Sequence, residues 1–347
     1  MRKKIIVAPL NWGLGHASRC VSIIYFLQEN NFIPIIASDG IALQFLRKEF
    51  PVLEYIKLPS YGISYAKNIK LGLLFQFPKV LLAIKKEQIV IANYISLNTD
   101  IVGVISDNRF GVRCINTPSV YITHQVQVLS GIATFFSSKI HQNYIKKFNE
   151  CWIPDTEKNR FSGLLSKSTN QKLHLKKIGV LSRFTKGSLP YKNDVLIILS
   201  GIESQRKALE DVLLYEFRNS KEKVVLVQGL IEKKQDVFEK NGIIIYNYLL
   251  SSELENEIKQ SKLIICRSGY SSIMDLAVLD KKAFFIPTPN QPEQEYLANY
   301  LEAEKIAPFS TEKGFRKEKI NVINNYKGLS SKNTNLNSNL LRLFKCK

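Results

Sequence analysis

The sequence lacks any apolar run long enough to cross a membrane. A spanning helix needs about 20 consecutive apolar residues, and no stretch of the 347-residue chain reaches that length. The first apolar run, Ile5–Ala8, is cut by Pro9 and Asn11, whereas the apolar region of a signal peptide covers roughly 7–15 residues. We therefore expect a soluble chain whose first apolar run is a buried strand.

Paired cysteines and metal-binding or nucleic-acid motifs are also lacking. The five cysteines include no C-x-x-C pair and are odd in number, which is typical of reduced thiols in the cytoplasm. No zinc-finger spacing, RNA-recognition signature or basic zipper occurs, so we expect no nucleic-acid partner. No Asp-x-Asp sequence follows a predicted strand, so we expect no essential metal.

Acidic residues are outnumbered by basic ones. Lys and Arg total 49, Asp and Glu total 30, and the formal net charge is +19. The basic residues are spread along the chain, so the excess suits a phosphorylated substrate, an anionic membrane surface or nucleic acid, or simply forms a solvated surface. Hydrophobic residues make up 45% of the chain, which is enough for two cores. The length predicts two domains at about 100–200 residues each.

Short apolar runs alternate with helical patterns in both halves of the chain. The predicted strands of the first half are 5–8, 32–37, 104–105 and 120–122, and its predicted helices are 17–30 and 41–49. After a polar, turn-rich segment the predicted strands are 195–199, 224–227, 243–245, 263–265 and 283–286. Buried strands alternating with helices indicate parallel sheets covered on both faces. We predict two doubly wound α/β domains, residues 1–187 and 188–327, and a tail over residues 328–347.

Residues 69–91 mix apolar and basic side chains. Lys70, Lys79 and Lys85 lie among leucines, isoleucines and phenylalanines. This mixture is typical of a segment at a membrane surface, and it predicts a peripheral contact with an anionic membrane. The alternative is an ordinary packed helix that begins after Pro78 and is preceded by a loop, because proline disfavours a helix interior.

The first motif whose residues could bind a ligand or take part in catalysis is the turn Gly13-Leu14-Gly15-His16, directly after the first predicted strand. Glycines let the backbone approach a ligand, and the N–H groups of the following helix attract an anion. His16 suits a general base because an imidazole titrates near neutrality; alternatively, it bonds only to its own backbone. Arg19 is predicted to pair with an anion, or else with a surface carboxylate.

Two further motifs follow predicted strands in the second half. After 263–265, small residues make a tight turn, and Asp275 falls about one turn into the next helix, where a carboxylate can accept both ribose hydroxyls. The alternative is that the Asp275 carboxylate is only stabilised by the helix dipole and binds no ligand. After 283–286, Gln294 lies where a polar loop leads into a helix, and it is predicted to bind sugar hydroxyls. The alternative is that Gln294 is only a solvated residue at the start of that helix.

The three motifs together resemble those of glycosyltransferase family 28. The elements are G-x-G-H near residue 13, Arg-Ser-Gly near residue 267 and Pro-x-Pro…Glu-Gln near residue 287, and the resemblance covers roughly residues 1–310. It implies the GT-B fold, in which two Rossmann-like domains face each other across a cleft, and a UDP-sugar donor held mainly by the C-terminal domain. The first turn lacks the Gly-Gly-x-Gly-Gly run of the family's peptidoglycan enzyme, so we do not expect that enzyme's substrate.

The resemblance also implies roles for individual residues. Asp275 stands where the family has a ribose-binding Glu, Gln294 matches a sugar-contacting Gln, and the uracil contact falls near Tyr248. His16 matches a histidine proposed to act on the acceptor. Asp107, at a strand end, is predicted to orient His16 or the acceptor, unless it bonds only to its own turn. The predicted donor-binding residues are Gly13, Gly15, Arg19, Ser200, Gly201, Tyr248, Arg267, Ser268, Gly269, Ser271, Ser272, Asp275, Gln291 and Gln294.

The favoured hypothesis is an inverting, metal-independent hexosyltransferase of cell-envelope or glycoconjugate synthesis, with a UDP-sugar donor and no separate cofactor. The acceptor would be a hydroxyl compound, lipid-linked in one version, at the inner face of the plasma membrane. One alternative is a nucleotide-sugar hydrolase of the pseudaminic acid pathway type, whose G-x-G-H-x-x-R turn and Asn-Gln pair resemble His16, Arg19 and Gln291. The others are a UDP-sugar epimerase and a basic, non-enzymatic protein that binds membrane or nucleic acid.

Overall fold

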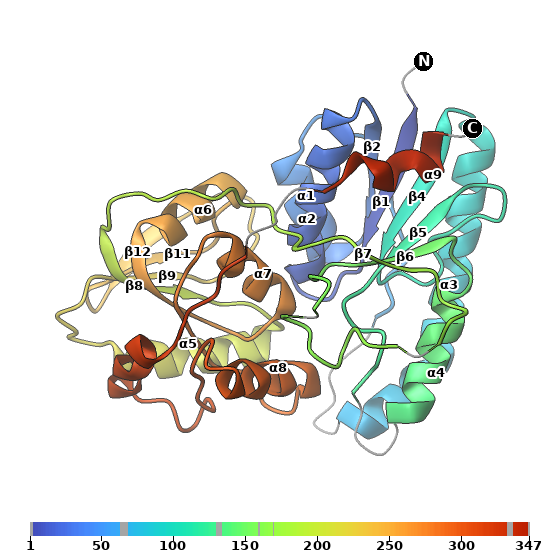
Figure 1. Ribbon diagram of the computed structural model, residues 1–347. Coiled ribbons are helices and arrows are strands. Elements are labelled where there is room, and N and C mark those ends of the chain that lie inside the picture. The colour runs from blue at the N-terminus through green and yellow to red at the C-terminus, as the bar shows by residue number, and fades with distance from the viewer. Residues whose placement is uncertain are drawn as a thin grey trace.

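The computed structural model of the protein describes residues 3–62, 69–129, 134–158, 160–168, 170–331 and 336–345. Two α/β domains lie side by side, each built on its own sheet (Figure 1). The predicted fold class is confirmed.

The first domain contains a parallel sheet of seven strands in the order β3-β2-β1-β4-β5-β6-β7. Side chains alternate between the two faces of a strand. Ile5 and Val7 of β1 therefore pack beneath α1 and α2, and Ile6 and Ala8 pack beneath α3. The strands are β1 (Lys4–Pro9), β2 (Ile33–Ser38), β3 (Tyr55–Lys57), β4 (Ile101–Asp107), β5 (Ser119–Ile122), β6 (Glu150–Ile153) and β7 (Leu175–Lys177), and the helices are α1 (Gly15–Glu29), α2 (Gly40–Glu49), α3 (Ile69–Leu97) and α4 (Thr134–Ile145).

The second domain contains a six-stranded sheet in the order β10-β11-β9-β8-β12-β13, in which only the β10–β11 pair is antiparallel. The strands are β8 (Asn193–Ile198), β9 (Val224–Val227), β10 (Val237–Lys240), β11 (Ile243–Tyr246), β12 (Ser261–Cys266) and β13 (Ala283–Phe285). The main helices are α5 (Glu203–Glu216), α6 (Ser251–Lys259), α7 (Tyr270–Val278) and α8 (Pro292–Ala303), and the 3-10 helix η2 (Lys317–Asn325) follows them.

The helix prediction at Pro78 is wrong in one respect. Instead of beginning after Pro78, α3 starts at Ile69 and continues through the proline to Leu97. An internal proline removes one backbone hydrogen bond but does not have to end a helix that gains from packing. The second half of α3 has such packing, because Ile91 is fully buried beneath the first sheet. The side chains of residues 69–77 lie outside the described part of the structure.

The two domains share one continuous hydrophobic core. Ala17 of α1 and Ile273 of α7 are fully buried in the same cluster, and α1 packs against α7. The chain passes from the first sheet to the second over residues 178–192. The predicted boundary between residues 187 and 188 falls in this segment and stays a prediction.

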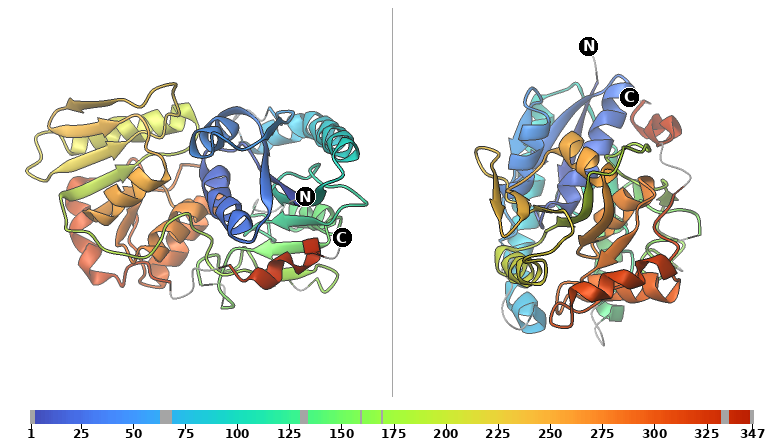
Figure 2. Two further views of the ribbon diagram at one scale, coloured as in Figure 1. Left: turned by 90° about the horizontal axis from the view of Figure 1, so that it is seen from above. Right: turned by 90° about the vertical axis from the view of Figure 1, so that its left-hand side faces the viewer.

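The C-terminal segment returns to the first domain. The 3-10 helix η3 (Ser338–Leu341) and helix α9 (Arg342–Lys345) lie against that domain (Figure 2). Phe344 is fully buried, with its ring 6.4 Å from that of Trp152. Its edge also covers Gly103 of β4, where a Cβ atom would lie 2.2 Å from Phe344 Cδ1. The position therefore accepts only glycine while Phe344 stays in place.

We expect Gly103→Ala to lower the free energy of unfolding by about 1–3 kcal/mol, because an added methyl group overpacks this site. In a Phe344→Ala background, which itself costs about 3–5 kcal/mol, the same substitution should cost almost nothing. Urea unfolding of the two single variants and the double variant measures both values. An equal cost of Gly103→Ala in the two backgrounds would show that Phe344 does not restrict this position.

Candidate active site

The turn between β1 and α1 lies beside the end of β4. The two strands are parallel neighbours, and Pro9 is in register with Asp107. The chain turns at Gly13, whose φ of +67° lies in the left-handed region that favours glycine. Because α1 begins at Gly15, His16 is placed in its first turn, above the carboxyl end of β4.

His16 and Asp107 form a hydrogen-bonded pair. The distance from His16 Nδ1 to Asp107 Oδ1 is 2.9 Å. The Asp107 side chain is fully buried, whereas the His16 side chain is 17% exposed. Asp107 is therefore shielded from solvent and acts through the groups that it touches. The structure brings the two predicted catalytic residues together.

Arg19 completes this buried group. Its Nε donates to Asp107 Oδ2 at 2.5 Å, and its Nη2 also contacts Asp107 Oδ1. Burial alone would raise the pKa of Asp107, but the charge of Arg19 and the hydrogen bonds from Arg19 and His16 outweigh it and hold that pKa below its usual range. Asp107 is thus a carboxylate at neutral pH. Arg19, predicted to bind an anion of the donor, instead lies buried against this carboxylate.

His16 is kept neutral near physiological pH. Burial, helped by the nearby positive charge of Arg19, lowers the pKa of His16 despite the opposing effect of Asp107. A neutral imidazole carries one N–H and one free nitrogen. If Nδ1–H donates to Asp107, Nε2 is free to accept a proton, which is the requirement for a general base.

The group continues into the second domain through two residues that were not predicted from the sequence. Arg19 Nη1 lies 3.1 Å from His124 Nδ1, and His124 Nε2 lies 2.8 Å from Glu293 Oε1. The ring of Tyr270 stacks on that of His124 at 4.1 Å. His124 follows the end of β5, and Glu293 lies in the first turn of α8. Two features of the sequence were indications: His124 comes just after a predicted strand, and Glu293 is the Glu of the Pro-x-Pro…Glu-Gln element near residue 287.

The Arg267–Ser272 motif meets the first motif at the domain interface. Ser271 Oγ donates to the backbone oxygen of Gly15 at 2.8 Å, and a Cβ atom on Gly15 would lie 3.3 Å from that hydroxyl. Gly269 is the residue before the first turn of α7, and Ser272 lies within that turn. The N-terminus of α7 therefore points toward the turn that carries His16.

Two residues of this motif are used inside the second domain. Arg267 is only 1% exposed, and its guanidinium donates to backbone oxygens, including that of Gln205 at 2.8 Å, and pairs with Glu312 at 2.7 Å. Ser268 Oγ donates to the backbone oxygen of Gln294 at 2.8 Å. These contacts hold the loops after β12 and β13 together, so both side chains bond to the protein itself.

The other predicted donor residues lie around the ends of the second sheet. Gly201, next to Ser200 between β8 and α5, has a φ of +104° and open space at its Cβ position. Gln291 Oε1 accepts from the backbone N–H of Gln294 at 2.8 Å and caps α8. Gln294 Oε1 in turn accepts from the N–H of Thr288. Tyr248 bonds across the domains to Lys48 at 3.1 Å.

Asp275 lies against the segment that connects the domains. Ser182 Oγ donates to Asp275 Oδ1 at 2.5 Å, and Arg183 Nε lies 3.7 Å from Oδ2. Burial raises the pKa of Asp275 to about 6, although Arg183 and Ser182 oppose the shift. Ionisation of Asp275 is therefore less favourable in the folded protein than in the unfolded chain.

This shift predicts the direction of a pH effect on stability. An unfolded aspartate titrates near about pH 3.9, so between that pH and about 6 the folded state binds more protons than the unfolded state. The contribution of Asp275 to stability must then fall as the pH rises through this window. We expect the free energy of unfolding of Asp275→Asn, relative to the unchanged protein, to rise by about 1–3 kcal/mol from pH 4 to 7. Urea unfolding of both proteins across this pH range measures the difference. Stability profiles that stay parallel between pH 4 and 7 would contradict the prediction.

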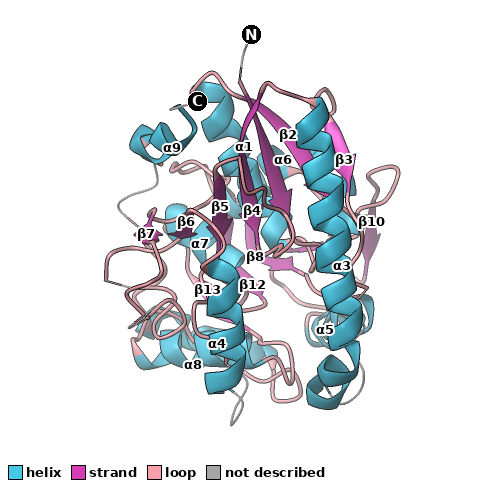
Figure 3. Ribbon diagram, turned by 90° about the vertical axis from the view of Figure 1, so that its right-hand side faces the viewer, coloured by secondary structure: helices cyan, strands magenta, loops and turns pink. Residues whose placement is uncertain are grey.

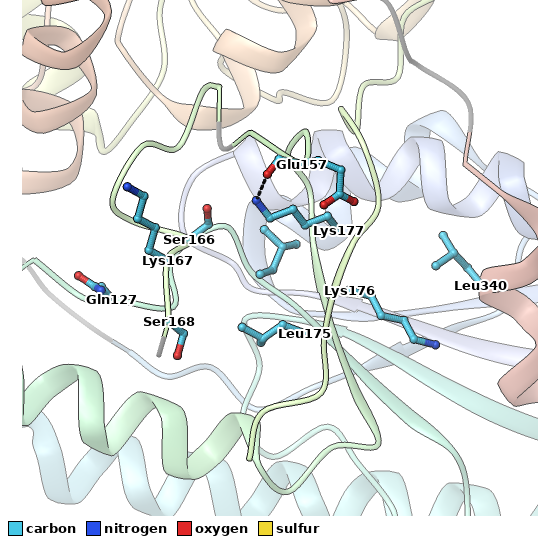
Figure 4. A pocket seen from close by; sticks show the side chains of 10 residues that line it. Gln127, Glu157, Ser166, Lys167, Ser168, Leu175, Lys176, Lys177 and Leu340 are labelled. Carbon is cyan, nitrogen blue, oxygen red and sulfur yellow. Dashed lines mark hydrogen bonds between the residues drawn. The ribbon is translucent and has the colours of Figure 1, made fainter. Parts of the chain in front are cut away.

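A cavity of about 820 Å³ opens beside the edge strand β7 (Figure 4). Ser166, Lys167, Leu175 and Leu340 are among its lining residues, and none of the predicted catalytic or donor-binding residues lines it. Lys177 points toward the backbone oxygen of Glu157 and bonds to it at 2.9 Å. The cavity is therefore separate from the candidate active site.

Metal-binding clusters and membrane-spanning helices are both lacking among the residues that the structure describes. Within them, no group of three or more His, Cys, Asp or Glu side chains is arranged to hold a metal ion. None of the helices in the same residues combines the length and the apolar character that crossing a membrane requires.

Comparison with known proteins gives one family match and several similar solved structures. Residues 196–338 match the glycosyltransferase family 28 C-terminal domain. No curated protein sequence matches the chain. Among solved structures, the glycotransferase of kitacinnamycin is similar, with 12% identity, a TM-score of 0.61, and coverage of 93% of this chain and 90% of that one.

Two further solved structures are similar to the chain, again with low sequence identity and high coverage. Arabidopsis thaliana UGT89C1, complexed with UDP-L-rhamnose, has 10% identity and a TM-score of 0.60, and the match covers 92% of this chain and 88% of that one. Acinetobacter baumannii MurG has 12% identity and a TM-score of 0.53, with the same coverage of both chains. The shared architecture is the GT-B fold of glycosyltransferases. The chain therefore has the GT-B fold, and residues 196–338 of its second half match the glycosyltransferase family 28 C-terminal domain.

Proposed function

We propose that the protein transfers a sugar from a UDP-sugar to a hydroxyl acceptor, with inversion at the anomeric carbon. The observation that carries the proposal is the His16–Asp107 pair, which faces a family 28 C-terminal domain. The UDP-L-rhamnose complex of a protein with the same fold supports a donor of this class.

His16 acts as the general base in this proposal. Asp107 accepts from Nδ1–H, which leaves Nε2 to take the proton of the acceptor hydroxyl. The acceptor oxygen then attacks C1 of the donor sugar from the face opposite the diphosphate. A bond forms between that oxygen and C1, the bond from C1 to the phosphate oxygen breaks, and UDP leaves with the bonding electrons.

The second domain holds the donor in this proposal. The backbone at Ser200-Gly201 and the N-terminus of α7 supply N–H groups where the diphosphate gains charge, as preorganised donors do for other developing anions. Gln294 binds sugar hydroxyls and Asp275 the ribose. Because Arg19 and Arg267 are buried in ion pairs, we assign them to positioning the two halves of the site.

The direct test is UDP release from a panel of UDP-sugars, measured with and without pools of hydroxyl acceptors. A transferase releases UDP at a rate that depends on the acceptor and forms a glycoside. UDP release at the same rate without acceptor would favour the hydrolase alternative, and no release from any UDP-sugar would reject the proposal.

We expect a chelator to leave this transfer unchanged. The base, Asp107 and the N–H groups at the α7 N-terminus provide charge stabilisation from the protein itself, so no step in the proposal uses a metal. Initial rates with excess EDTA should stay within about twofold of the untreated rate. A loss that added Mg²⁺ or Mn²⁺ restores would show that a metal takes part.

We also propose a peripheral contact with an anionic membrane on the cytoplasmic side. Figure 3 shows α3 and α4 extending beyond the first sheet at the same end. On α3, Leu82 is 58% and Ile89 60% exposed, and on α4 Phe135 and Phe136 are each 69% exposed. Co-sedimentation with vesicles containing acidic lipids tests the contact, and a Phe135→Ser/Phe136→Ser variant should lose it. Equal sedimentation of both proteins would contradict this surface.

A further inference from the structure

A hydrogen bond between His124 and Glu293 links the two domains next to the proposed base. Its length is 2.8 Å, and the side chains of His124 and Glu293 are 6% and 21% exposed. His124 belongs to the first domain, and Glu293 begins a helix of the second. The bond can therefore form only when the two domains are in contact.

The partners of His124 define which of its nitrogens carries the hydrogen. A guanidinium has only donors, so Nδ1 must accept from Arg19 Nη1 at 3.1 Å. The hydrogen of a neutral His124 then sits on Nε2, where it donates to Glu293. The other group that faces the ring is Tyr270, which stacks on it and directs its hydroxyl to the backbone oxygen of Pro154. Among the residues that the structure describes, Glu293 is the one placed to accept this hydrogen.

The same guanidinium competes for His16. Arg19 Nη2 and Asp107 Oδ1 both lie 2.9 Å from His16 Nδ1. If Nδ1–H donates to Asp107, Nε2 is free and His16 can act as a base. If Nδ1 instead accepts from Arg19, the hydrogen moves to Nε2 and the base is blocked. The position of Arg19 therefore selects the active tautomer of His16.

We propose that Glu293 and His124 are positioning residues that couple contact between the domains to the active tautomer of His16. Glu293 keeps the hydrogen of His124 on Nε2, and the free Nδ1 of His124 then accepts from Arg19 Nη1, which fixes the guanidinium against Asp107 and leaves Asp107 as the acceptor for Nδ1–H of His16. When Glu293 is withdrawn, His124 is released to carry hydrogen on Nδ1, Arg19 loses this acceptor, and its Nη2, which already lies 2.9 Å from His16 Nδ1, donates there instead. The inference rests on the proposed role of His16 as the base, and it makes that base available only when the domains are closed.

The test is the tautomeric state of the histidines in the free, full-length protein. Two-bond ¹⁵N–¹H spectra of histidine-labelled protein distinguish the two tautomers, and the chain has only 4 histidines. In the unchanged protein we expect hydrogen on Nδ1 of His16 and on Nε2 of His124. Glu293→Ala should shift His16 toward the Nε2–H form, whereas Glu293→Gln, whose amide oxygen still accepts, should keep both tautomers.

Controls separate positioning from general damage. Glu295→Ala alters the next carboxylate of the same helix turn, which bonds to the N–H of Asn290, and should change neither tautomer. His124→Phe removes the acceptor for Arg19 and should shift His16 even if Glu293→Ala fails to fold. Unchanged His16 in a folded Glu293→Ala or His124→Phe variant would overturn the inference.

Kinetics provide a second measurement. If the tautomer shifts, kcat of Glu293→Ala should fall about 10–100-fold with a smaller change in the KM for the donor, and Glu293→Gln should retain most of kcat. A rise in KM alone would mean that Glu293 serves only to hold the donor, and would contradict a positioning role. Because the spectra need no substrate, a protein with the expected tautomers but no transferase activity would refute the proposed function and not this inference.

Discussion

Replacing His16 with alanine is expected to reduce kcat by about 10²–10⁴-fold, the usual contribution of a positioned general base. Its Nε2 is the only imidazole nitrogen near the glycine turn that the hydrogen-bond pattern leaves free among the described residues. UDP affinity should stay within about twofold, because in this proposal the second domain binds the nucleotide. Steady-state kinetics and calorimetric titration of UDP give the two values.

The matched control is His174→Ala. His174 lies just before β7, and its Nδ1 contacts the backbone oxygen of Asn149, away from the proposed base. We expect its turnover to equal that of the unchanged protein. Turnover of His16→Ala at the level of His174→Ala would remove His16 from the chemistry.

Replacing Asp107 with asparagine is expected to have the broadest effect of any single substitution. The charge of Arg19 is then buried without its partner, which costs about 3–5 kcal/mol of stability. The amide also no longer selects Nδ1–H of His16, and loss of the equivalent carboxylate in a catalytic triad lowers kcat by about 10⁴-fold. Urea unfolding and kinetics on the folded fraction measure the two effects.

Asp100→Asn provides the same chemical change at the other end of β4. Asp100 pairs with Lys4 at 3.1 Å, and the two side chains are 24% and 23% exposed. Such a pair contributes about 0–1 kcal/mol, so this variant should be nearly as stable and as active as the unchanged protein. Equal losses of stability in the two variants would contradict the buried ion pair described for Asp107.

The sequence predicted the parts of the fold and site that depend on local pattern. The strands that begin each domain, such as β1 and β8, are continuous runs of Ile, Val and Leu, and they were recognised as buried strands. His16 and Asp107 were selected because both follow predicted strands, and parallel strands end at one edge of a sheet. Their meeting follows from the adjacency of β1 and β4.

The parts that were missed depend on contacts between distant segments. Strands β3 and β7 have three residues each, and β10 is exposed, so none has an apolar run to mark it. The contact of Arg19 with Asp107 was not predicted, because one turn of helix does not reveal that its guanidinium turns inward. His124 and Glu293 meet only because the two domains pack together, which no local pattern encodes.

The most direct test of the central claim is a calorimetric titration of the protein with UDP, compared with ADP, GDP and CMP. A UDP-sugar transferase should bind UDP with a Kd below about 1 mM, the upper end of usual substrate affinities, and should bind the other nucleotides more weakly. UDP also stabilises the folded state if it binds there, so the melting temperature should rise with UDP concentration. Absence of both heat and stabilisation with UDP and with UDP-sugars would contradict the account.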